Sequence, residues 1–140
     1  MRKGDVVREL LLEINETASE LHSANLKGIA RPLEDAIKDM QAATEWLIEK
    51  GGASTDDGLA GATPYLRMFG TTVGGWLLAK SALQAKKQID EGNDSEFLQA
   101  KIETAIFYAE QLLPQVSGLL PATVSGAQSL YAIKPERLRS

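Results

Sequence analysis

Apolar residues recur along the chain at alternating steps of four and three residues. Between about Asp5 and Asn25 the row consists of Val7, Leu11, Ile14, Ala18 and Leu21. A second row consists of Leu33, Ile37, Met40, Thr44 and Leu47. This period places apolar side chains on one face of an α-helix. We therefore expect one helix over about 5–25 and another that begins at Pro32, a favourable first-turn residue, and ends before Gly51-Gly52. Asn25 and Gly28 are interpreted as stop signals between them.

The next segment, residues 51–62, contains four glycines and is predicted to be a loop. A third helix is predicted from Thr63, as the cap, and Pro64 to about Glu91. From Tyr65 to Ala85 its only charged residues are Arg67 and Lys80. Because a helix that is apolar on every side must be covered on more than one face, we expect this helix to be central.

A turn at Gly92-Asn93 leads to a fourth helix, for which Asn93 and Glu96 are the expected capping pair. Its apolar row consists of Leu98, Ile102, Ala105, Ala109 and Leu112. Pro114 is expected to kink or interrupt it, with apolar residues continuing to Val124. No strand pattern competes. The sequence therefore predicts an all-α, antiparallel, up-and-down four-helix bundle with a short C-terminal helical extension, as a single domain over 1–133, followed by a flexible tail over 134–140.

Composition narrows the function without giving it. The chain has 140 residues, no cysteine and a net charge of −4. These values exclude disulfides and thiolate chemistry and give no basic surface for nucleic acid. No apolar run approaches the roughly 18 residues of a membrane span, and charged residues interrupt the N-terminal stretch where a signal peptide would be. We expect a cytoplasmic protein that binds neither nucleic acid nor membrane.

Catalytic constellations are missing from the sequence. His22 is the only histidine, and no glutamate stands three residues before it, as di-iron bundles require. No Gly-x-Ser-x-Gly elbow is present, and Gly58–Gly61 lacks the lysine of a phosphate-binding loop. The row Glu9, Glu13, Glu16 and Glu20 is interpreted as a solvated face. We predict no catalytic, cofactor-binding or metal-binding residue in this chain.

The third helix contains the candidate site residues. Gly70, Gly74 and Gly75 lie inside it, where each glycine costs up to about 1 kcal/mol relative to alanine. We expect close approach of another helix of the chain, or of a partner, to offset this cost. Trp76 is interpreted as core rather than interface, and Trp46 fits either. The predicted close-packing or interface set is Tyr65, Phe69, Gly70, Gly74, Gly75 and Trp76.

Two stretches carry a family resemblance. They are Ala62-Thr-Pro-Tyr65-Leu-Arg-Met-Phe69-Gly70 with Gly74-Gly75-Trp76, and Ala105-Ile-Phe107-Tyr108-Ala109 through Pro114. They resemble the extra C-terminal helical domain of one branch of the acyl-CoA dehydrogenases, the branch that includes methylthiopropanoyl-CoA dehydrogenase. The resemblance is best over residues 62–131.

The resemblance implies an accessory or interface domain of an FAD-dependent acyl-CoA dehydrogenase that is not catalytic by itself. In the family, flavin and the glutamate base lie in domains N-terminal to this one, so no such residue is assigned here. The implied partners are the catalytic domains of a parent chain and further copies in a homo-oligomer. Two alternatives stay open: an independent helical adaptor that dimerises through the Gly70/Gly74 face, and a free-standing enzyme.

Overall fold

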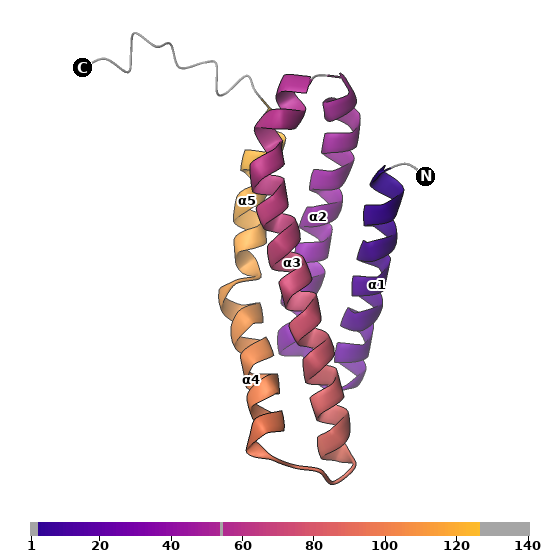
Figure 1. The fold of residues 1–140 in the computed structure, drawn as a ribbon, viewed down its shortest axis with the longest axis vertical. Helices are drawn as coiled ribbons and strands as arrows, with labels where there is room; N and C mark the ends of the chain where they lie inside the picture. The colour runs from indigo at the N-terminus through magenta and orange to yellow at the C-terminus, as the bar shows by residue number, and fades with distance from the viewer. Residues whose placement is uncertain (1–2, 54, 127–140) are drawn as a thin grey trace, which may run out of the picture.

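The computed structural model describes residues 3–53 and 55–126, which fold into an all-α bundle (Figure 1). Its helices are α1 (Lys3–Ser23), α2 (Lys27–Ala53), α3 (Thr55–Asp90), α4 (Glu96–Gln111) and α5 (Pro114–Val124). Helices α1, α2 and α3 run antiparallel in turn, and α4 and α5 follow one another along the fourth position. The described residues contain no strand, so the predicted fold class is confirmed. The predicted tail over 134–140 lies outside the described residues.

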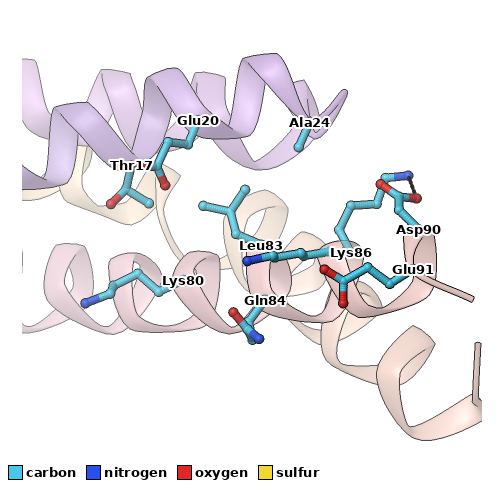
Figure 2. Close-up of a pocket in the computed structure, with 10 residues that line it drawn as sticks. Thr17, Glu20, Ala24, Lys80, Leu83, Gln84, Lys86, Asp90 and Glu91 are labelled. Atoms are coloured by element: carbon cyan, nitrogen blue, oxygen red, sulfur yellow. Dashed lines mark hydrogen bonds and ion pairs between the residues drawn. The ribbon is translucent and has the colours of Figure 1, made fainter. Parts of the chain in front are cut away.

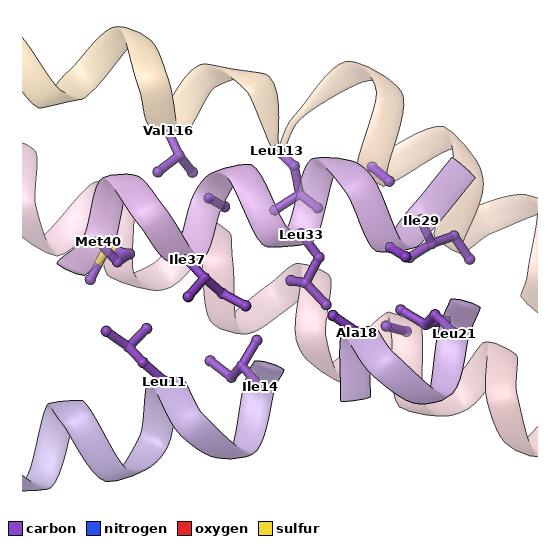
Figure 3. Packing of buried hydrophobic residues seen from close by; sticks show 14 of the residues in the cluster. Leu11, Ile14, Ala18, Leu21, Ile29, Leu33, Ile37, Met40, Leu113 and Val116 are labelled. Carbon is purple, nitrogen blue, oxygen red and sulfur yellow. The ribbon is translucent and has the colours of Figure 1, made fainter. Parts of the chain in front are cut away.

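Helices α2 and α3 form the centre of the bundle, because each of them packs against all the other helices. The four-three rows face this centre: Leu11, Ile14 and Leu21 of α1 are buried against residues of α2 such as Leu33 and Met40 (Figure 3). Burying one such side chain stabilises the fold by roughly 1.5–3 kcal/mol. The central position expected for the third helix is confirmed, and α2 shares it.

The start of the second helix was predicted five residues too late. Helix α2 begins at Lys27, so Gly28 and Pro32 lie inside it and the break is a short turn. Asn25 makes this turn with a φ of 62°, a left-handed conformation that asparagine tolerates. The helix begins before Pro32 because Ile29 and Ala30 are buried against the core. This burial outweighs the weak stop signal of an exposed Gly28.

The predicted loop over 51–62 is wrong. Helix α2 continues to Ala53 and α3 already begins at Thr55, so Thr63 and Pro64 lie inside α3 and neither starts it. The physical reason is visible at Gly61, where a Cβ would collide with the backbone carbonyl oxygen of Thr123 at the end of α5. Gly61 is therefore required for the close approach of two helices and does not make a turn.

Two further boundaries concern α4 and α5. Ser95, not Asn93, caps α4: its backbone is extended and its Oγ accepts a hydrogen bond from the Leu98 N–H at 3.2 Å. The interruption at Pro114 is confirmed, because α4 ends at Gln111 and α5 begins at Pro114. Between them Leu113 is buried in the core, which fixes the direction in which α5 leaves.

Candidate functional site on helix α3

The predicted site residues lie on different sides of α3 and do not form one surface. The Tyr65 hydroxyl lies 2.8 Å from the Thr44 hydroxyl of α2. On the side facing α1, the Trp76 indole N–H donates to the Thr17 hydroxyl at 2.9 Å. Phe69 is half-buried against the core. Tyr65, Phe69 and Trp76 thus connect α3 to its neighbours within the chain. Trp46, for which the sequence left core and interface open, is half-buried on α2.

Gly74 and Gly75 are positions of close helix approach. A Cβ at Gly74 would collide with the phenol oxygen of Tyr108 on α4, and a Cβ at Gly75 would lie 2.8 Å from Cδ2 of Leu113. The absence of both side chains lets α4 and the start of α5 pack closely on α3. Tyr108 gains a hydrogen bond there, because its hydroxyl donates to the Thr71 carbonyl oxygen at 2.7 Å. Sequence reasoning quoted Tyr108 as part of a motif but assigned it no role.

Tyr108→Phe is expected to lower the free energy of unfolding by about 1 kcal/mol, because it removes this partly buried hydrogen bond. Burial raises the pKa of Tyr108 above its ordinary value of 10.0. Above that pH the unfolded phenol loses its proton before the folded one, so the stability that Tyr108 contributes declines as pH rises. Urea unfolding of both proteins at about pH 8 and about pH 11 checks this. A gap between them that widens with pH contradicts it.

Gly70 differs from the other two glycines because a Cβ there would meet no atom within 4 Å. It lies in an open groove of about 570 Å³ between α3 and α5. This α3/α5 groove is lined by Arg67, Gly70, Thr71, Gln115, Gly118 and Leu119. Gly118, on the α5 wall, also faces open space. Gly118 was not among the residues selected from the sequence. The one feature that could have pointed to it is that it is a glycine in the middle of an apolar stretch.

Gly70→Ala is expected to raise the free energy of unfolding of this chain by about 1 kcal/mol, because alanine favours a helix interior and meets no neighbour. The urea midpoint of the variant, compared with that of the unsubstituted chain, measures the change in stability. A lower midpoint would mean that the groove is closed in solution.

Large apolar side chains remain exposed along α3 and α4. Leu66 and Leu77 of α3 are 68% and 55% exposed, and Phe97 and Phe107 of α4 are 69% and 63% exposed. Leu66 stands one helical turn before Gly70 but is not among the residues that line the α3/α5 groove. Phe97 lines a smaller groove between α3 and α4, with Leu78, Ser81 and Lys101. Exposed apolar side chains beside grooves are typical of a surface that another molecule covers.

A larger cleft, of about 700 Å³, separates α1 from the C-terminal half of α3. Figure 2 shows Thr17 and Glu20 extending from α1 toward α3, opposite Lys80 and Leu83. Three lysines and three acids line this cleft, so their charges balance, and Lys86 pairs with Asp90 at 2.9 Å. All three acids are exposed. The cleft therefore offers no buried acid or base for proton transfer.

His22 is part of a link between helices. It lies in the last turn of α1, and its Nε2 is 2.7 Å from Oε1 of Glu34 on α2. The glutamates Glu9, Glu13, Glu16 and Glu20 are exposed, as expected of a solvated face. Within residues 3–53 and 55–126 no three His, Asp or Glu side chains converge to hold a metal ion. In that same part of the chain, no helix is both long and apolar enough to cross a membrane.

Comparison with known proteins connects this geometry to a family. Residues 10–134 match the family model described as acetyl-CoA dehydrogenase C-terminal like. The chain is also 35% identical, over 116 residues, to 3-methylmercaptopropionyl-CoA dehydrogenase of Ruegeria pomeroyi. That match covers 81% of this chain and 20% of the relative, so the chain spans about a fifth of the relative's length. The family model covers nearly all of the bundle, and the chain therefore belongs to the acetyl-CoA dehydrogenase C-terminal-like family of helical domains.

Proposed function

We propose that this chain is the C-terminal accessory domain of a larger FAD-dependent acyl-CoA dehydrogenase and that it does not catalyse by itself. The observation that carries the proposal is the 35% identity to a dehydrogenase of which the matched segment is one fifth. The reaction chemistry then belongs to the other parts of the native protein. This bundle covers part of the catalytic body or contributes to the subunit interface.

The geometry supports a structural role better than a chemical one. FAD is expected in the native enzyme, where it accepts hydride from the acyl-CoA. The residues of the α1/α3 cleft do not suit a flavin, because no aromatic side chain lines it and its charges compensate one another. We therefore derive no flavin contact from this chain. The exposed Leu66, Leu77, Phe97 and Phe107, in contrast, suit a surface that packs against protein.

The mass and flavin content of the native protein test this function. An antibody raised against this chain, used on extracts of the source cells, is expected to detect a band several-fold larger than 15.1 kDa. The protein purified with that antibody is expected to have the absorption spectrum of FAD and to oxidise an acyl-CoA. A band of the chain's own size, without flavin, would contradict the proposal.

The second candidate is an independent adaptor or dimerisation module, which the open groove at Gly70 favours. The sequence suggested that such a module would dimerise through Gly70 and Gly74. Tyr108 lies against Gly74, so only Gly70 of this pair is open. A self-associating surface would have to centre on Gly70 and Leu66. Sedimentation of this chain over a wide concentration range distinguishes the candidates, since a strict monomer counts against the module.

A further inference from the structure

We draw no further inference here: the strongest candidate, the outer face of α3 and α4 on which Leu77, Phe97 and Phe107 remain exposed, carries none because nothing in the described residues shows whether a second copy of the chain or another part of a larger enzyme covers it.

Discussion

Leu33→Ala is expected to lower the free energy of unfolding by about 2–5 kcal/mol. Leu33 has no exposed surface, and it lies on α2, which packs against every other helix. In Figure 3 it extends into the space bounded by Ala18 of α1 and Leu113. Truncation removes buried methyl groups and leaves a cavity that helices held from several sides cannot fill. The loss is a large fraction of the 5–15 kcal/mol that such domains typically have.

Urea unfolding followed by circular dichroism measures this loss, with Leu12→Ala as the control. Leu12 is the same residue type in the middle of a neighbouring helix, but it is 62% exposed. Its truncation is expected to change stability by less than about 0.5 kcal/mol. Equal losses for the two variants would contradict the arrangement of the core around α2.

Gly61→Ala is expected to lower the free energy of unfolding by about 1–3 kcal/mol, although alanine is the better helix former. The added methyl group would collide with the Thr123 carbonyl oxygen, and it would also lie 3.3 Å from Cδ2 of Leu47. Because the main obstacle is backbone, no change of rotamer relieves the collision. Either α3 or the end of α5 has to move.

Gly70→Ala is the matched control for Gly61→Ala. Both substitutions add one methyl group to α3, and the predicted changes have opposite signs because a Cβ at Gly70 meets nothing. Thermal or urea unfolding of the two variants side by side is sufficient. Stabilisation by Gly61→Ala would mean that α3 and α5 are not in close contact at this end of the bundle.

Helical periodicity was sufficient to predict the fold class and most of the core. The rows of α1 and α2 required only the sequence, because burial follows the four-three step: Leu11, Ile14, Leu33 and Ile37 are all buried. Boundaries were harder, because glycine has two uses. Glycines between 51 and 62 predicted a loop, yet Gly61 serves the contact between α3 and Thr123, which are distant in sequence. No local pattern reports such a contact.

The candidate site also depends on contacts between residues that are distant in sequence. Spacing placed Gly70 and Gly74 on one face of the third helix, but it could not show that Tyr108 covers one and leaves the other open. That difference depends on where α4 ends and how Leu113 directs α5 across α3. Gly118 enters the groove for the same reason, and no feature near Gly70 in the sequence points to it.

Deletion of this domain from the larger dehydrogenase that we propose contains it is the decisive test of the accessory role. Removing the segment that corresponds to residues 10–134 is expected to reduce acyl-CoA oxidation, FAD content and assembly of the enzyme together, because an apolar surface loses its cover. Turnover, flavin content and sedimentation are measured on the truncated and the intact protein. A truncated enzyme that keeps normal assembly, full FAD content and unchanged turnover would contradict the proposed accessory role.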